Sequence, residues 1–282
     1  MAGVATPDRP RLIVNADDFG YTAGINRGIV EAHASGVVTS TSLLVNMPGW
    51  DDALPLARST PALGIGVHIN LTQGQSLERV PSLTDSRTGH FRGIPALVAR
   101  ALAGRLDADE VYAECRAQIS RVRSAGVSVT HVDSHMHAHL LPAISGPLVR
   151  AAADEGIHAV RWPRERLTPF WWDVSATMKR LALQAALGVR GTPPPGVRSP
   201  DHFAGTAVQG GGSRAERIAG LLDSLESGTT ELMVHPGYVD AQLVGLDNYT
   251  WQREQELAAL MSGRVRGRLA RGDIQLVSFA SV

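Results

Sequence analysis

The chain has 282 residues, 44% of them hydrophobic and 19% charged, a composition typical of a globular protein with a sizeable core. Lysine plus arginine and aspartate plus glutamate number 27 each, so no net basic field exists to attract nucleic acid or an anionic membrane surface. Cys115 is the only cysteine, which excludes an intrachain disulfide framework. This charge balance suits a small, largely uncharged substrate.

The N-terminal segment has neither the basic start nor the apolar run of a signal peptide, and no apolar stretch approaches the roughly 20 residues of a membrane span. We therefore expect a cytoplasmic protein without a membrane span. Because α/β barrels often reach this length as one unit, we expect residues 1–282 to form a single domain.

Short apolar runs alternate with helical patterns along the chain. Leu12-Ile13-Val14 predicts a strand ending at Asn15, followed by a helix that Thr22 caps and Gly36 ends. Further strands are predicted at residues 37–45, 65–69, 127–132, 157–162, 232–234 and 274–279. Helices are predicted near residues 51–58, 94–103, 108–124, 215–225 and 251–269, with another that Pro142 opens.

Two stretches interrupt this alternation. Residues 72–92 are rich in turn-forming residues and predict a long loop over the site. Residues 163–212 have the least regular pattern, and we interpret them as an insertion that could form a lid. Strand-helix alternation predicts a parallel sheet, either open and doubly wound or closed into a barrel. About seven strands favour an α/β fold of the TIM-barrel-like (β/α) barrel type.

Polar residues follow the predicted strands at their carboxyl ends, where α/β proteins bind ligands. They are Asp17, Asp18, His68, the run from His131 to His139, Arg161 and His235. Histidines scattered over a surface would have no reason to follow apolar strands, so we expect these side chains to converge on one rim. Four other histidines lack such a context and are expected to be structural or surface residues: His33, His90, His158 and His202.

The histidine run contains five polar residues of the same parity, which face one side wherever the segment is extended: His131, Asp133, His135, His137 and His139. Neutral imidazole is the commonest metal ligand, so the cluster predicts a metal site. Histidine and carboxylate without thiolate suit zinc, manganese, iron, cobalt or nickel, and suit magnesium less well because it prefers oxygen.

Asp17 and Asp18 are adjacent carboxylates, which could simply occupy a turn before the next helix. Only one of two neighbours in an extended segment can point to a given side, so one can bind a metal while the other acts as a base beside it. Asp18-Phe19-Gly20 also matches the metal motif of kinases, but no His-Arg-Asp loop or glycine-rich phosphate loop accompanies it. His235, before Pro236-Gly237, could act as a general acid or only cap a strand end.

Four segments together resemble the YdjC-like carbohydrate deacetylase family: Asn15-Ala16-Asp17-Asp18-Phe19-Gly20, Gly66-Val67-His68-Ile69-Asn70-Leu71-Thr72, Thr130-His131-Val132-Asp133-Ser134-His135-Met136-His137 and Met233-Val234-His235-Pro236. Residues 38–46 resemble the family's second strand. The similarity runs from about residue 11 to 282 and is weakest between 163 and 212. It implies a TIM-barrel-like fold, often dimeric, that removes an acetyl group from N-acetylated sugars such as chitooligosaccharides.

The resemblance also implies a metal triad, carried by Asp18, His68 and His135, with Asp17 as catalytic base and His235 as acid. Three protein ligands leave open positions for a water and the acetyl carbonyl oxygen, so attack by the metal-bound water is expected. We expect one divalent ion, magnesium or zinc. Four further residues are expected to orient these ligands or bind substrate: His131, Asp133, His137 and Arg161. Trp162, Trp171 and Trp172 could stack on sugar rings, although we favour core packing for them.

Two other readings stay open on the residues alone. One is a binuclear amidohydrolase or phosphoesterase, because the His135-x-His137 and His137-x-His139 pairs resemble ligands of such sites. The other is a noncatalytic protein that binds a sugar or stores a metal, against which an Asp17 base argues. A branch of the resembled family is associated with hopanoid lipid biosynthesis, so the acetylated substrate could also be a glycolipid.

Overall fold

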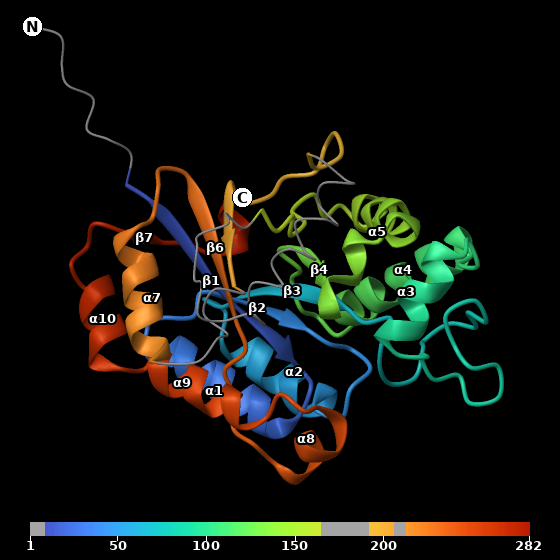
Figure 1. Ribbon diagram of the computed structural model, residues 1–282, viewed down its shortest axis with the longest axis horizontal. Helices are drawn as coiled ribbons and strands as arrows, with labels where there is room; N and C mark the ends of the chain where they lie inside the picture. The colour runs from blue at the N-terminus through green and yellow to red at the C-terminus, as the bar shows by residue number, and fades with distance from the viewer. Residues whose placement is uncertain (1–8, 165–191, 206–212) are drawn as a thin grey trace, which may run out of the picture.

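The computed structural model describes residues 9–164, 192–205 and 213–282 (Figure 1). Their strands form one parallel sheet with the order β4-β3-β2-β1-β6-β5, and β7 also pairs with β1. The strands are β1 (Arg11–Phe19), β2 (Ser40–Leu43), β3 (Gly64–Ile69), β4 (Val132–Ser134), β5 (His202–Ala204), β6 (Thr229–Val234) and β7 (Gln275–Leu276).

Helices flank this sheet and pack against one another around it. They are α1 (Ala23–Ala34), α2 (Trp50–Ser59), α3 (Ile94–Leu102), α4 (Ala108–Ser124), α5 (Pro142–Asp154), α7 (Arg214–Asp223), α8 (Ala241–Leu246), α9 (Trp251–Leu260) and α10 (Gly263–Leu269), with short 3-10 segments at His135–Leu140 and Phe279–Ser281. In Figure 1, α3, α4 and α5 lie together beyond the β3 and β4 edge, whereas α7, α9 and α10 lie on the side of β6 and β7. None of the helices described is long and apolar enough to cross a membrane.

The sheet is an open half-barrel, which corrects the closed barrel expected from the sequence. Within the described ranges, β4 and β5 do not pair with each other. The predicted strand at 157–162 supplies only single parallel bridges, between Val132 and Val160 and between Ala159 and Arg198. On that stretch Val160 N–H donates to Arg198 and Arg161 N–H to Val132, too few bonds to extend the ladder into a full turn of a barrel.

Most predicted elements are present with shifted ends. The helix at 108–124 has the predicted bounds, the Thr22 hydroxyl caps α1, and Gly36 follows α1 with φ +83°. The helix predicted at 251–269 is two helices, because Ser262 accepts a hydrogen bond from Val265 N–H and starts α10 anew. The strand predicted at 127–132 is instead the short β4, and the stretch at 72–92 carries only two isolated bridges and is the loop expected.

The stretch at 163–212 is not purely an insertion, because its described part contains β5, a strand of the main sheet. Trp162 is buried with Leu140, Phe203 and Met233, in agreement with a core role. Trp171 and Trp172 lie outside the described residues. A single large hydrophobic cluster links residues from Leu12 to Ile274, and the expectation of one domain stays a prediction.

A close backbone contact places the β6 end against α1. A Cβ atom at Gly28 would lie 2.6 Å from the Gly237 Cα, and Gly237 follows the His235-Pro236 turn. No side chain larger than hydrogen fits there without moving backbone. Glycine at both positions therefore brings the turn onto the helix.

We expect Gly28→Ala to lower the free energy of unfolding by about 1–3 kcal/mol, because overpacking against backbone forces the turn away from α1. Gly220→Ala is the matched control, since nothing lies within 4 Å of its added Cβ on α7 and a helical alanine stabilises by roughly 0.5–1 kcal/mol. Urea unfolding of both variants checks this. A Gly28→Ala protein as stable as the wild type would contradict the contact.

Candidate active site

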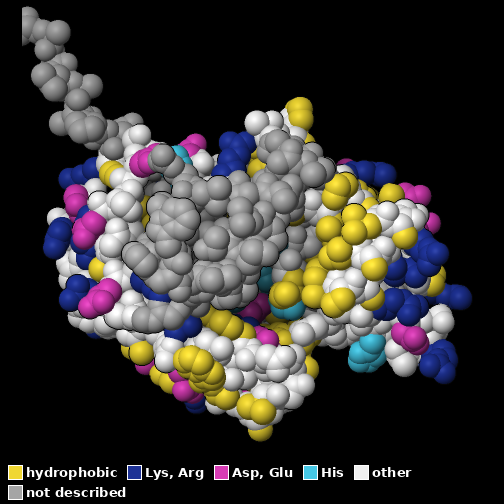
Figure 2. All heavy atoms as spheres, in the orientation of Figure 1, with side chains coloured by type: hydrophobic (Ala, Val, Ile, Leu, Met, Phe, Trp, Pro, Cys, Tyr) yellow, Lys and Arg dark blue, Asp and Glu magenta, His cyan; other side chains and the backbone are white. Residues whose placement is uncertain are grey.

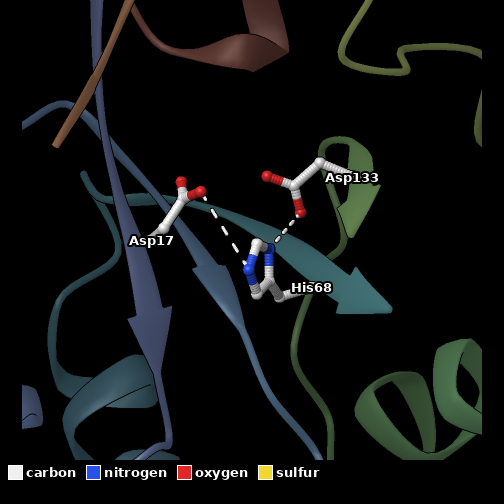
Figure 3. A group of neighbouring side chains, drawn as sticks. All are labelled: Asp17, His68 and Asp133. Atoms are coloured by element: carbon white, nitrogen blue, oxygen red, sulfur yellow. Dashed lines mark hydrogen bonds and ion pairs between the residues drawn. The ribbon is translucent and has the colours of Figure 1, made fainter. Parts of the chain in front are cut away.

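Asp17, His68 and Asp133 point toward one another at the carboxyl ends of β1, β3 and β4 (Figure 3). His68 pairs in register with Asp133, and its Nδ1 lies 2.7 Å from Asp133 Oδ1. Its Nε2 lies 4.0 Å from Asp17 Oδ2 on the other side. All three side chains are buried, and their ligand-type atoms lie within 4.8 Å of one another. The convergence of β1, β3 and β4 residues predicted from the strand ends is therefore confirmed.

Arg161 contacts three buried carboxyl groups at this point. Its Nη1 and Nη2 each donate to a different oxygen of Asp17, at 2.7 and 2.6 Å. Nη1 also contacts Asp133 Oδ2 at 2.7 Å, while Nε and Nη2 both contact Glu231 Oε1 at 2.7 Å. These five contacts equal the five N–H donors of a guanidinium. Arg161 is fully buried, so each contact replaces one that water would make.

These ion pairs set the charge of the site. Burial raises the pKa of Asp17, but the Arg161 guanidinium more than offsets it, and the pKa lies below its usual value. Burial lowers the pKa of His68, but the carboxylates of Asp133, Asp17 and Asp18 outweigh it and raise this pKa to about 9. Burial raises the pKa of Glu231 to about 7 despite Arg161. Asp17 is thus ionised at neutral pH.

Asp18 points to a different partner. The strand β1 extends to Phe19, so both aspartates lie within it, and its register with β2 shifts between Ala16 and Phe19. At this irregularity Asp18 has φ +74°, a strained value for a residue other than glycine. Its Oδ2 accepts from Arg253 Nη2 at 2.8 Å. Its Oδ1 is buried without a hydrogen-bond partner and lies 3.5 Å from His68 Nε2.

His135 faces the same space, with its ring centroid 5.8 Å from that of His68. Its Nδ1 lies 2.6 Å from Thr72 Oγ1, and Thr72 Oγ1 donates to Asn70 Oδ1 at 3.0 Å. Because the hydroxyl proton is used by Asn70, the Nδ1 of His135 carries the proton of the ring and donates it to Thr72. Burial lowers the pKa of His135 to about 4, so the ring is neutral with its lone pair on Nε2.

The remaining histidines of the run do not share one face. The chain is extended only to Ser134, after which Met136 and His137 take positive φ values of 56° and 52°. The parity prediction is therefore wrong beyond residue 134. His131 stacks on Phe279 with ring centroids 3.8 Å apart, and burial lowers its pKa to about 3. It lies in the core, 3.2 Å from a Ser42 hydroxyl that donates to Asp133.

His137 and His139 turn toward the β5 side of the site. The two rings meet edge to face with centroids 6.0 Å apart, and His137 also meets Phe203 edge to face. His139 Nδ1 lies 2.6 Å from the Ser134 hydroxyl. Burial lowers the pKa of both rings, so both are neutral. In the described part of the chain, His137 Nδ1 and His139 Nε2 are buried without a hydrogen-bond partner.

His235, from the end of β6, is half-buried and held by residues of the α8–α9 region. Its backbone N–H donates to Glu256 Oε2 at 2.6 Å, and its ring meets Tyr249 edge to face with centroids 5.9 Å apart. The Tyr249 hydroxyl donates to the other oxygen of Glu256. His235 is also close enough to contribute to the lowered pKa of Asp18.

The sequence interpretation missed several residues of the site. Five buried polar residues bonded to the expected site residues were not given a role from the sequence: Asn15, Ser42, Thr72, Glu231 and Arg253. Glu231 precedes the apolar run at 232–234 from which the strand was predicted, so it gave no signal; in the structure β6 begins at Thr229 and includes it. Arg253 lies within an ordinary polar helix pattern and gave no signal.

Among the described residues, one group has its ligand-type atoms within 4.8 Å of one another, and the ligand set expected from the family resemblance is a second candidate. Asp17, His68 and Asp133 are the closest set, but both aspartates bond Arg161 and the His68 Nδ1 is occupied by Asp133. The second set is Asp18, His68 and His135. In it the Asp18 Oδ1 has no partner, and each histidine has its Nδ1 engaged, which leaves Nε2 as the donor atom. Two imidazole nitrogens and one carboxylate oxygen fit a divalent ion.

Part of the histidine segment reaches the molecular surface. Figure 2 shows histidine and acidic side chains near the centre of the face, next to hydrophobic side chains. Met136, between two site histidines, is 56% exposed. A ligand approaching this rim meets both polar and apolar groups.

Residues 11–271 of the chain match a family model described as YdjC-like protein. A carbohydrate deacetylase from Brevibacillus brevis is 38% identical over 96% of this chain and 99% of its own length. A chitooligosaccharide deacetylase from Klebsiella pneumoniae is 36% identical over 96% of this chain and 98% of its own length. A crystal structure from Enterococcus faecalis, described as a "putative cellobiose-phosphate cleavage protein", superposes with a TM-score of 0.76 and 29% identity, covering 97% of this chain and 99% of that one.

We expect the metal-free protein to lose stability as pH rises from about 6.5 to about 9. His68 binds its proton more tightly folded than unfolded, so its contribution is complete below the unfolded pKa and is lost through the folded pKa of about 9. The loss is on the order of a few kcal/mol. Urea unfolding with chelator across this range measures it.

His68→Gln should flatten that part of the pH profile, whereas His158→Gln, at an exposed position away from the site, should leave it unchanged. The same slope in His68→Gln as in the wild type would show that another group is responsible.

Proposed function

Since this chain belongs to the YdjC-like protein family, we propose that it is a carbohydrate N-deacetylase that hydrolyses the acetamido group of an N-acetylated sugar, such as a chitooligosaccharide, with one divalent metal ion. The observation that carries the proposal is the separation of two adjacent aspartates into different surroundings. Asp17 lies against Arg161, whereas Asp18 offers an unpartnered oxygen beside His68. A base and a metal ligand placed side by side are what amide hydrolysis requires.

Asp18, His68 and His135 are the proposed ligands of the ion. The Asp133 carboxylate and the Thr72 hydroxyl each accept the Nδ1 proton of one histidine, which fixes the tautomer and the ring orientation. The proton that His68 holds below pH 9 must leave when an ion binds, so metal uptake releases a proton. Two nitrogen donors favour zinc, with magnesium as the alternative.

Asp17 is the proposed general base. When bound, the ion supplies a Lewis acid that polarises the acetyl carbonyl and lowers the pKa of a water. Asp17 takes the proton from the attacking water, and a carboxylate has four acceptor positions, so its two bonds to Arg161 leave room for this. Arg161 keeps Asp17 ionised and fixes its plane.

His235 is the proposed general acid that protonates the departing amine. Glu256, on α9, accepts a hydrogen bond from the His235 backbone N–H, and Tyr249, just before α9, packs against the His235 ring. These two contacts fix the position of His235 at the rim. Of the residues expected to support the ligands, Asp133 orients His68 and Arg161 orients Asp17. His131 supports Asp133 through Ser42, and His137 is proposed to contact substrate.

The binuclear alternative finds less support. A second ion would need carboxylates, and Asp17 and Asp133 are bonded to Arg161. Which acetylated substrate binds, a chitooligosaccharide or a glycolipid, depends on the side chains around the rim of the site. The homodimer and the cytoplasmic location expected from the sequence stay predictions.

We expect the protein to release acetate from N-acetylglucosamine oligomers, to stop when a chelator removes the ion and to resume when zinc or magnesium is added back. Asp17→Asn should lower kcat by roughly 10²–10⁴ with one ion per chain retained, because it removes proton transfer and leaves the three ligands. His158→Gln should behave as wild type. Acetate release that survives complete metal removal would contradict the proposal.

Thr72→Val should weaken metal affinity about 10- to 100-fold, because the Nδ1 proton of His135 loses its acceptor and the ring its orientation. Thr72→Ser keeps the hydroxyl and is the matched control. Competition with a metallochromic chelator measures both affinities. Equal affinities of Thr72→Val and Thr72→Ser would argue against His135 as a ligand.

A further inference from the structure

The two oxygens of Asp18 are in different environments. Oδ2 accepts a hydrogen bond from Arg253 Nη2 at 2.8 Å. Oδ1 is buried, accepts no hydrogen bond, and has only the longer ion pair with His68 Nε2 at 3.5 Å. The positive φ of Asp18 at the β1 irregularity fixes the backbone from which the carboxylate projects. One oxygen is therefore committed to an arginine and the other is available.

Arg253 is itself held firmly. It comes from α9 and is 2% exposed. The same Nη2 contacts Asp247 Oδ2 at 2.7 Å, and Nε donates to the Tyr249 carbonyl at 2.8 Å. The guanidinium carbon lies 5.6 Å from the ring centroids of both Tyr21 and Tyr249. A side chain with these restraints cannot follow Asp18 if the carboxylate rotates.

We infer that Arg253 is a positioning residue that reserves a single oxygen of Asp18 for the divalent ion, and that Asp247 shares its charge so that Asp18 remains a strong ligand. This inference rests on the proposed ligand set of Asp18, His68 and His135. A carboxylate can bind a cation through one oxygen or both. With Oδ2 on Arg253, binding through Oδ1 alone keeps one more position open for water or the acetyl oxygen.

Charge balance explains why Arg253 contacts two carboxylates, those of Asp18 and Asp247. A guanidinium beside a cation site repels the cation, so Arg253 alone would reduce metal affinity. Asp247 contacts the same Nη2 and offsets that charge. Removing Arg253 and removing Asp247 should therefore change metal affinity in opposite directions, which a purely structural ion pair would not do.

Arg253→Met tests the first half of this inference. Metal-free protein titrated with zinc against a chromophoric competitor should bind on the order of tenfold more tightly than wild type, because a repulsive charge is lost and Oδ2 is freed. At saturating zinc, kcat/KM should fall about 10- to 100-fold, because Asp18 then takes a second position on the ion. The d–d absorption of the cobalt-substituted variant should weaken as the coordination number rises.

The controls separate these effects from loss of a buried arginine. Arg268→Met is the matched control, because Arg268 lies on α10, is 9% exposed and forms ion pairs with Asp223 and Asp273. This variant should leave the zinc affinity and the cobalt spectrum unchanged. Asp247→Asn keeps Arg253 and is tolerable at a side chain that is 24% exposed. It should weaken zinc binding on the order of tenfold with an unchanged cobalt spectrum.

Weaker or unchanged zinc binding in Arg253→Met would overturn the inference. If Arg253→Met is too unstable to purify, unchanged or tighter zinc binding in Asp247→Asn would overturn it. If Asp18→Asn binds zinc as tightly as the wild type, the proposed ligand set is wrong, and the inference falls with it. The two failures are distinguishable because only the second involves Asp18 itself.

Discussion

The site depends on one arginine that contacts three buried carboxyl groups. Arg161 donates to Asp17, Asp133 and Glu231, which come from β1, β4 and β6. Without that cation, the neighbouring carboxylates of Asp17 and Asp133 could not both stay ionised in a buried space. Because a guanidinium is planar and has five donors, it also sets the plane of Asp17 and one oxygen of Asp133. The remaining oxygen of Asp133 then orients His68.

This arrangement gives two adjacent aspartates different chemistry. Asp17 and Asp18 are consecutive in β1, but the irregularity in that strand turns Asp18 toward Arg253 and leaves Asp17 on Arg161. Each arginine keeps its aspartate ionised. Asp17 accepts on both oxygens, which suits a base with a fixed plane, whereas Asp18 keeps one oxygen without a partner, which suits a ligand. Backbone geometry and two cations thus separate the roles.

The sequence predicted much of this and missed parts for definable reasons. Apolar runs followed by Asp17, His68 and Asp133 identified the rim, because parallel strands end at one edge. The closed barrel was wrong, since the 157–162 segment makes only single bridges, and β5 was hidden in an irregular stretch. The histidine run was interpreted as one extended face, but Met136 and His137 adopt positive φ, which no pattern of residue types indicates. Arg253 is brought to Asp18 by tertiary folding across 235 residues.

Anomalous diffraction from crystals of the zinc-loaded protein would show whether Asp18 binds the ion while Asp17 does not. We expect one ion per chain, bonded to Asp18 Oδ1 and to the Nε2 atoms of His68 and His135, with Asp17 still bonded to Arg161. An ion bonded to both Asp17 and Asp133, with Arg161 displaced from them, would contradict this expectation.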